Sequence, residues 1–208
     1  ISRSSPVFDN EGNFYLPMSK YDPFNHHAEA NGSAGNMVYD TALYSFAPDS
    51  NGTPRWSVAV ENRVSMPPCS FNYDYSKIYL PLNQTVYCFN PDDGALFWKY
   101  SRNIEHGEFR ANAAVDDVGN VYVGTKGDYA STLYAIKADG TSLLWEAVLG
   151  GDLYTSATLG DDGNIYITSE TSYKGAFYSI DRHTGEILWT LPGTRDNFEG
   201  GGYPRLVN

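Results

Sequence analysis

The chain has few basic residues and no long apolar segment, and each shortage excludes a class of function. Only 14 of its 208 residues are Lys or Arg, against 25 Asp and Glu, so the formal net charge is −11. Binding to nucleic acid or to an anionic membrane surface needs clustered positive charge, which this composition does not supply. No run of about 18 apolar residues occurs, so the sequence predicts no membrane-spanning helix.

Cysteine is also scarce, and the two that occur do not predict a disulfide. We expect Cys69 in the first strand and Cys88 in the third strand of one sheet. A strand between them separates the two by about 9–10 Å, whereas the Cα atoms of a disulfide lie within about 7 Å of each other. Both are therefore predicted to be buried free thiols.

Aromatic residues are plentiful and recur at a fixed spacing. They make up 15% of the chain, and glycine contributes 20 residues, a mixture typical of strands and tight turns. The four tryptophans are separated by 42, 47 and 44 residues and are Trp56, Trp98, Trp145 and Trp189. This spacing is close to the roughly 40–45 residues of a four-stranded propeller blade. The sequence is therefore a repeat whose unit has the length of one blade.

Each repeat carries a tyrosine and two turns at matching positions. The tyrosine lies in the second expected strand and is Tyr15, Tyr79, Tyr122 or Tyr166. Turns such as Asp116–Asn120 precede that strand, and a second turn rich in Asp and Gly precedes each tryptophan. Asp caps these turns, and Gly adopts the positive φ that they need. Four strands joined in this way predict one antiparallel sheet per repeat. A β-sandwich, the other all-β fold, would not repeat its aromatic positions four times.

The passage from Ser179 to Trp189, SIDRHTGEILW, resembles a known motif. It is similar to the tryptophan-docking motif of quinoprotein-like β-propellers, which carry pyrroloquinoline quinone-type repeats. That motif runs Ala-x-Asp-x-x-Thr-Gly-x-x-x-Trp, and Gly185 matches its glycine. The other repeats match less completely, and the second keeps Gly94 and Trp98. The resemblance covers nearly the whole chain and implies a structural role for the repeated tryptophans, tyrosines and glycines.

The repeat and the resemblance together predict an all-β propeller of four-stranded antiparallel blades over residues 1–208. Four complete blades are expected at about 5–60, 64–102, 109–150 and 153–192, with the first strand of a fifth at 203–208. Quinoprotein-like propellers have about seven or eight blades, so four blades form part of a ring. We expect a longer parent chain to supply the missing blades, or else a second copy. The third alternative is closure at four blades.

The sequence contains no motif for catalysis or for metal binding. It has no nucleophile elbow, phosphate loop, HExxH or Cys-x-x-Cys, and its Asp and Gly turns lack the closing Glu of a calcium loop. The adjacent cysteine pair that the resemblance implies for quinoprotein alcohol dehydrogenases is missing. We therefore assign no catalytic residue, cofactor or metal ligand. We expect a non-catalytic binding or scaffold module that takes a protein or carbohydrate ligand. The alternatives are a fragment of a quinone-dependent dehydrogenase and a carbohydrate-binding module.

Loops that depart from the repeat are the expected functional surface, because propellers bind through loops at one rim. These loops are Met18–Asp40, Asn103–Arg110, Lys126–Thr132 and Arg195–Gly202. Sequons for N-glycosylation begin, each in a predicted loop, at Asn31, Asn51 and Asn83. Since the sequence starts at Ile1 rather than Met, we expect that a signal peptide or a preceding domain is missing from it. The acidic, lysine-poor composition and the resemblance predict an extracytoplasmic location, secreted or periplasmic.

Overall fold

The computed structural model describes residues 4–21, 39–60, 67–104, 107–127, 130–170 and 175–193. All regular secondary structure in this part of the chain is β-strand. The strands form four antiparallel sheets, in which successive strands are hydrogen-bonded neighbours. The prediction of an all-β fold of four-stranded antiparallel units is confirmed. The number of blades in a closed ring stays a prediction, and the expected fifth unit at 203–208 lies outside the described residues.

The first two sheets follow the strand order of the sequence. The first sheet contains β1 (Val7–Phe8), β2 (Phe14–Tyr21), β3 (Tyr39–Phe46) and β4 (Pro54–Ala59). The second sheet contains β5 (Ser70–Phe71), β6 (Ile78–Leu82), β7 (Thr85–Phe89) and β8 (Leu96–Ser101). Between the third and fourth strands of each sheet, the ladder shifts register just before the turn that leads to the tryptophan.

The third and fourth sheets repeat this plan with one addition. The third sheet contains β10 (Ala114–Val115), β11 (Val121–Gly127), β12 (Ala130–Ile136) and β13 (Leu143–Gly150). The fourth sheet contains β14 (Thr158–Leu159), β15 (Asn164–Glu170), β16 (Gly175–Asp181) and β17 (Ile187–Pro192). The additional strand β9 (Gly107–Phe109) pairs with the far end of β11 and makes the third sheet five-stranded.

Aspartate side chains close the turns between the first and second strands of most sheets. The Asp9 carboxylate accepts the backbone N–H of Asn13 at 2.9 Å and the hydroxyl of Tyr15 at 2.9 Å. Asp116 accepts the hydroxyl of Tyr122 at 3.0 Å in the same way. Burial opposes ionisation of Asp9, but the hydrogen bonds from Asn13 and Tyr15 hold its pKa below the ordinary value. A short turn signal in the sequence thus fixes both the turn and the tyrosine after it.

Neighbouring sheets pack face to face, and the same two faces meet at each interface. The tryptophan face of a sheet carries the tyrosine of its second strand and the tryptophan of its fourth. Residues on the other side, the receiving face, pack against the tryptophan face of the preceding sheet. In the second sheet, the receiving face consists of Phe71, Ile78, Leu80, Tyr87 and Phe89. Because side chains alternate across a strand, each sheet presents both faces at once.

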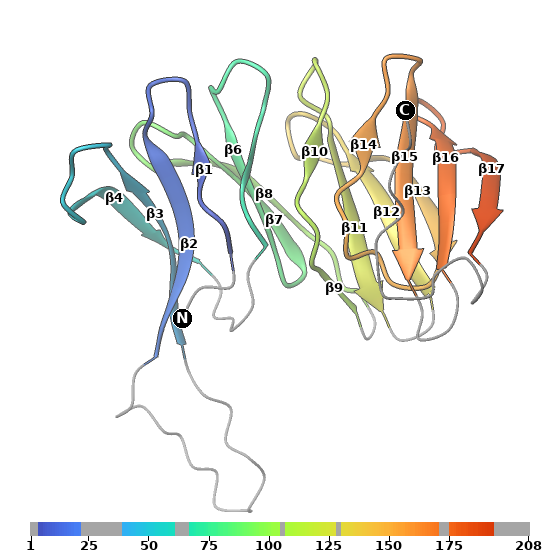
Figure 1. Cartoon of the computed structure of the whole chain (residues 1–208), viewed down its shortest axis with the longest axis horizontal. Coiled ribbons are helices and arrows are strands. Elements are labelled where there is room, and N and C mark those ends of the chain that lie inside the picture. Colours follow the sequence, from blue (N-terminus) through green and yellow to red (C-terminus); the bar gives the residue numbers. More distant parts are fainter. Residues whose placement is uncertain are drawn as a thin grey trace, which may run out of the picture.

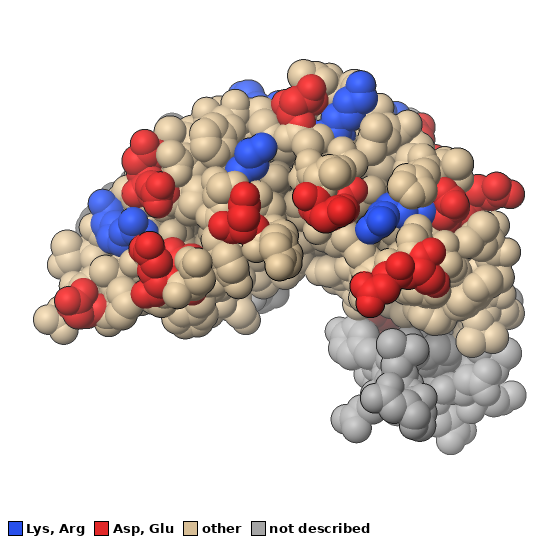
Figure 2. Space-filling model, turned by 90° about the horizontal axis from the view of Figure 1, so that it is seen from above, with Lys and Arg blue, Asp and Glu red and all other residues tan. Residues whose placement is uncertain are grey.

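The four sheets stand side by side in an open crescent (Figure 1). The turns that join β1 to β2, and their equivalents in the other sheets, form the upper rim in this view, and the described connections at the opposite ends of these strands form the lower rim. Figure 2 shows the crescent from above, with acidic side chains spread over this face. The first and fourth sheets lie at opposite ends, so each has one face that no other described sheet covers.

Candidate functional site

The lower rim is where the chain departs most from its repeat. Two of the four predicted surface loops, Asn103–Arg110 and Lys126–Thr132, lie there and are largely within the described residues. The other two, Met18–Asp40 and Arg195–Gly202, fall mostly or wholly outside them. One of the two described loops connects the second sheet to the third and the other lies within the third sheet, and the structure brings them together.

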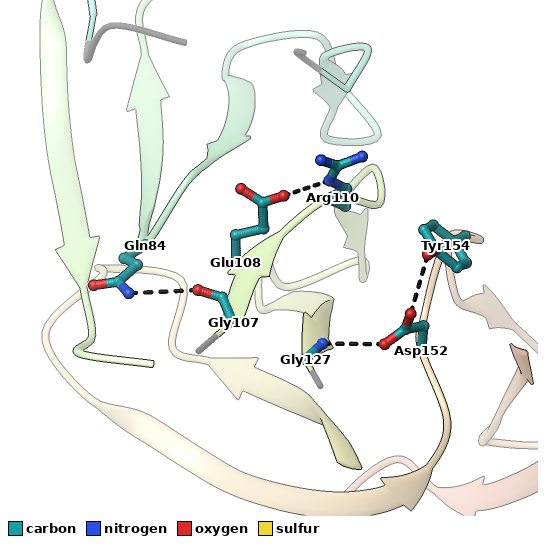
Figure 3. A network of polar contacts seen from close by, with 7 residues as sticks. All are labelled: Gln84, Gly107, Glu108, Arg110, Gly127, Asp152 and Tyr154. Carbon is teal, nitrogen blue, oxygen red and sulfur yellow. Dashed lines mark hydrogen bonds and ion pairs between the residues drawn. The ribbon is translucent and has the colours of Figure 1, made fainter. Parts of the chain in front are cut away.

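Strand β9 joins the two described loops. It pairs with the end of β11, placing Glu108 opposite Lys126 and Gly107 opposite Gly127. On the other side, the amide of Gln84 donates to the carbonyl of Ile104 at 2.8 Å. The same amide also donates to the carbonyl of Gly107 at 3.4 Å, and Glu108 is ion-paired to Arg110 (Figure 3). The connection between the second and third sheets is therefore held at both ends.

A second polar group lies beside this strand, in the connection between the third and fourth sheets. One carboxylate oxygen of Asp152 accepts the backbone N–H of Gly127 at 3.2 Å, and the other accepts the hydroxyl of Tyr154 at 3.0 Å (Figure 3). The backbones of Asp152 and Glu170 exchange two hydrogen bonds, at 2.7 and 2.8 Å. The carboxylate is therefore fixed in place by both the third and the fourth sheet.

Tyr154 presents its ring to solvent at this point. Its side chain is 41% exposed, and the ammonium of Lys126 lies 5.8 Å from the ring centroid. Burial of the hydroxyl, with its hydrogen bond to Asp152, raises the pKa of Tyr154, so the phenol stays neutral. We call Lys126, Asp152 and Tyr154 the lower-rim cluster. It offers a ring face for stacking, a cation and a carboxylate, which together suit binding more than bond-breaking chemistry.

The predicted structural residues lie at the interfaces between sheets. Indole N–H groups donate to backbone carbonyls of the next sheet: Trp56 to Pro91 at 2.9 Å, Trp98 to Ala138 at 3.1 Å and Trp145 to Arg182 at 2.9 Å. Gly94 and Gly185 lie under the rings of Trp56 and Trp145, where an added Cβ would come within 2.8 and 2.7 Å. Gly140, which the motif did not single out, lies in the same way under Trp98.

The remaining predicted residues have different surroundings. Tyr15, Tyr79 and Tyr122 are buried, whereas Tyr166 is half-buried. Trp189 contacts the rings of Tyr166 and Phe177 within its own sheet and is 45% exposed. A structural role for this whole set stays a prediction.

The described cysteines and sequon asparagines lie in or next to the first and second sheets. Cys69 lies just before β5 and Cys88 lies in β7, and both are buried free thiols. Asn51 lies exposed in the turn before β4, and Asn83 lies half-buried in the hairpin between β6 and β7. The Asn83 carbonyl accepts the backbone N–H of Phe109 at 2.6 Å. Asn31 falls outside the described residues, and glycosylation of all three sequons stays a prediction.

Sequence reasoning did not single out Asp152 and Tyr154. The passage from Gly150 to Tyr154, GGDLY, could have indicated them. It follows a predicted strand and combines two glycines with the polar residues Asp152 and Tyr154. Gly151 has a positive φ of 84°, which turns the chain sharply into this corner. Lys126 was within a predicted loop, but nothing local indicated its neighbours.

The repeated sheets and their repeated interface define a β-propeller. Residues 82–200 match the model of a PQQ-repeat family described as outer membrane protein assembly factor BamB. Because this match covers more than half of the chain, the chain belongs to that family of PQQ-repeat β-propellers. Comparison with curated proteins gave no significant match.

Several solved structures share this fold at low identity. A europium-containing methanol dehydrogenase is similar with TM-score 0.63 and 11% identity, covering 89% of this chain and 40% of that one. The quinohemoprotein alcohol dehydrogenase from Comamonas testosteroni gives 0.62 and 12%, covering 91% and 34%. The quinohemoprotein alcohol dehydrogenase ADHIIG from Pseudomonas putida HK5 gives 0.56 and 14%, covering 74% and 32%. At these identities the likeness shows the fold alone. This chain spans less than half of each enzyme.

The names of these enzymes raise the question of whether the chain could hold a quinone or its metal ion. Across the described ranges, His, Cys, Asp and Glu form no group of three or more that could hold a metal ion. Cys69 and Cys88 are separated in sequence and do not form an adjacent pair. The described residues therefore offer no such ligand group for a metal ion, and no chemical step is assigned to one. The same part of the chain has no helix long and apolar enough to span a bilayer.

Proposed function

We propose that the chain is a non-catalytic binding or scaffold module that contacts a protein partner through its lower rim. The observation that carries this proposal is the lower-rim cluster, in which Asp152 holds the exposed ring of Tyr154 beside Lys126. Exposed tyrosines fixed by hydrogen bonds are typical anchors of protein interfaces, because they bury much area at little entropic cost. The rigid sheets beneath keep the anchor in place.

The family description supports a protein partner and an extracytoplasmic location. That description names an assembly factor of the outer membrane, and the net charge of −11 does not favour nucleic acid. Both remain part of the proposal, since the solved structures show the fold alone.

Site-specific photo-crosslinking in envelope extracts of the source organism tests the proposal. A crosslinking amino acid at position 154 should capture a defined protein, identified by mass spectrometry, and the added substitution Lys126→Glu should reduce the yield several-fold. Tyr73 is the matched control, because it is a tyrosine 90% exposed on the opposite rim. Equal labelling from both positions, or none from position 154, would contradict a partner at the lower rim.

A carbohydrate ligand is the second candidate, and the same cluster favours it. Sugars stack on exposed aromatic rings and bond to carboxylates such as Asp152. Binding on a glycan array that Tyr154→Ala removes and Tyr73→Ala leaves intact would replace the protein partner with a carbohydrate. Alcohol-dependent dye reduction by the chain, supplied with quinone and calcium, would instead favour the dehydrogenase alternative.

A further inference from the structure

The lower rim carries the same four-residue pattern on two neighbouring sheets. One copy runs from Gly107 to Arg110 and reads GEFR, and the other runs from Gly151 to Tyr154 and reads GDLY. Each copy ends at the fourth residue before the strand that starts its sheet, β10 or β14. Both therefore hold the same place in the repeat, with glycine first, an acidic residue second and an apolar residue third.

The third residue of each copy fixes the pattern to the preceding sheet. Phe109 and Leu153 are both buried. The backbone N–H of Phe109 donates to the carbonyl of Asn83 at 2.6 Å, and that of Leu153 donates to the carbonyl of Thr125 at 3.1 Å. The backbone of the pattern is therefore held in the same way in both places.

The second residue of each copy holds the side chain of the fourth. Glu108 is ion-paired to Nε of Arg110, and Asp152 accepts the hydroxyl of Tyr154 (Figure 3). Arg110 thus has on the third sheet the place that Tyr154 has on the fourth, and its side chain is 37% exposed. The anchor position of the lower rim therefore occurs twice, one repeat apart.

Lys126 lies between the two anchor positions. It is directly opposite Glu108 in the pairing of β9 with β11, and its ammonium lies 5.8 Å from the centroid of the Tyr154 ring. Opposite residues in an antiparallel pair have their Cβ atoms about 4.5–5.5 Å apart. The ion pair of Glu108 with Arg110 and the lower-rim cluster therefore form one continuous surface.

The unused hydrogen-bonding capacity of this surface lies in its cations. Within the described part of the chain, the two Nη groups of Arg110 have no hydrogen-bond or ion-pair partner, and the ammonium of Lys126 contacts only Tyr154. Asp152, by contrast, already accepts two hydrogen bonds. Guanidinium and ammonium groups only donate, so they need a ligand that accepts. Two parallel N–H groups of a guanidinium match the two oxygens of a carboxylate.

Arg102 shows the contrasting case of a guanidinium whose terminal nitrogen is engaged by its own chain. Its Nη2 is ion-paired to Glu146 at 2.6 Å, and the centre of the guanidinium lies 5.0 Å from the centroid of the Tyr134 ring. The side chain of Arg102 is 35% exposed, close to the value for Arg110. The two arginines therefore differ in their bonding rather than in their exposure.

We infer that the lower rim binds an acidic segment of its protein partner, with a carboxylate on Arg110 and an apolar or aromatic side chain on the ring of Tyr154. The inference rests on the proposed function and gives the partner a chemistry. Packed sheets lie about 10 Å apart and an extended chain advances about 3.3 Å per residue, so about three residues separate the two contacts. The net charge of −11 repels acidic segments from the rest of the surface, which favours this site over others.

Selection of a phage-displayed library of random peptides on the full 208-residue chain tests the inference. The selected peptides should share an Asp or Glu about three residues from an aromatic or large apolar residue. Replacing that acid by its amide in a synthetic copy should weaken binding, measured by fluorescence anisotropy, by about 10-fold or more. Selected peptides that lack an acidic residue, or that are rich in Lys and Arg, would overturn the inference.

Substitutions in the chain test the two cations separately. Arg110→Lys keeps the positive charge but cannot bind a carboxylate through two parallel hydrogen bonds, so the acidic peptides should bind about 10-fold more weakly. Arg102→Lys is the matched control and should leave their affinity unchanged. Lys126→Gln should weaken binding several-fold, whereas Lys137→Gln, an exposed position in the turn at the other end of β12, should not. Circular dichroism checks that each variant keeps the fold.

Tyr154→Ala separates this inference from the proposed function. Peptides that need Tyr154 but bind Arg110→Lys as tightly as the unsubstituted chain would overturn the acidic segment and leave a partner at the lower rim in place. Peptides that bind equally well without the Tyr154 ring would overturn both, and so would a library from which no peptide is selected.

Discussion

Trp145 and Trp189 hold the same position in their sheets and differ only in what lies beyond them. Trp145 donates to the carbonyl of Arg182 in the next sheet at 2.9 Å, and its ring covers Gly185. Trp189 has no such neighbouring sheet among the described residues and is 45% exposed. Replacing each by alanine therefore separates the effect of an interface between sheets from that of the position itself.

The expected magnitudes follow from burial. A fully buried tryptophan removes about 150–250 Å² from water, which corresponds to about 4–6 kcal/mol at about 25 cal/mol per Å². Trp145 is partly buried, so about half of that applies, and its hydrogen bond adds about 1 kcal/mol. We expect Trp145→Ala to lower the free energy of unfolding by about 3 kcal/mol, and Trp189→Ala by about 1 kcal/mol.

Urea denaturation followed by circular dichroism measures both losses. Each variant is compared with the unsubstituted chain at the same protein concentration. Equal losses for the two variants would show that the interface is not the source of the stability. A loss below about 1 kcal/mol for Trp145→Ala would show that its indole does not hold the third sheet to the fourth.

Three further predictions concern single buried contacts. Gly185 and Gly163 have φ values of 77° and 83°, but only Gly185 lies against an indole, so Gly185→Ala should lower thermal stability by at least about 1 kcal/mol more than Gly163→Ala. The buried hydroxyl of Tyr79 has no hydrogen-bond partner, so in denaturant titrations Tyr79→Phe should leave the free energy of unfolding unchanged or raise it. Tyr122→Phe loses a hydrogen bond to the Asp116 carboxylate and should lower the free energy of unfolding by about 1 kcal/mol. Burial raises the pKa of the Cys88 thiol to about 12, so at neutral pH a thiol reagent should label it only after denaturant unfolds the chain, and rapid labelling of the native chain would contradict that burial.

The fold could be predicted from sequence because its signals are local and repeated. The hydrogen bond from Tyr122 to Asp116 joins residues only six positions apart, and the same pattern recurs between Tyr15 and Asp9. Tryptophan spacing then gave the length of the unit. These features depend on short segments, so the sequence alone determines them.

The second repeat shows the limit of that reasoning. Its first turn is one residue longer, and Asn72 caps it by accepting the backbone N–H of Lys77 at 2.9 Å. No carboxylate then reaches Tyr79, whose hydroxyl is left buried and unpaired. Cys88, opposite Tyr79 on β7, offers only a weak sulfur acceptor. The irregular turn was visible in the sequence, but its effect on Tyr79, seven residues after Asn72, was not.

The lower-rim cluster could not be predicted, because its residues meet only after the third and fourth sheets have packed. Lys126 lies in β11 of the third sheet, and Asp152 and Tyr154 lie in the connection to the fourth. The pairing of β9 with β11 depends on how the second and third sheets pack, and no periodic pattern marks it in the sequence.

The contacts that hold the sheets together and the residues of the lower rim are different, so substitutions at the rim should leave the fold intact. Stability in repeat folds is close to a sum of unit and nearest-neighbour interface terms, and here those terms lie in the indole, carbonyl and glycine contacts between sheets. The lower-rim residues lie outside those contacts. Tyr154 contacts only surface groups in this cluster, the Asp152 carboxylate and the Lys126 ammonium, so Tyr154→Ala should change binding while costing less than about 1 kcal/mol of stability. A frame held together at its interfaces can therefore carry different ligand specificities on the same rim.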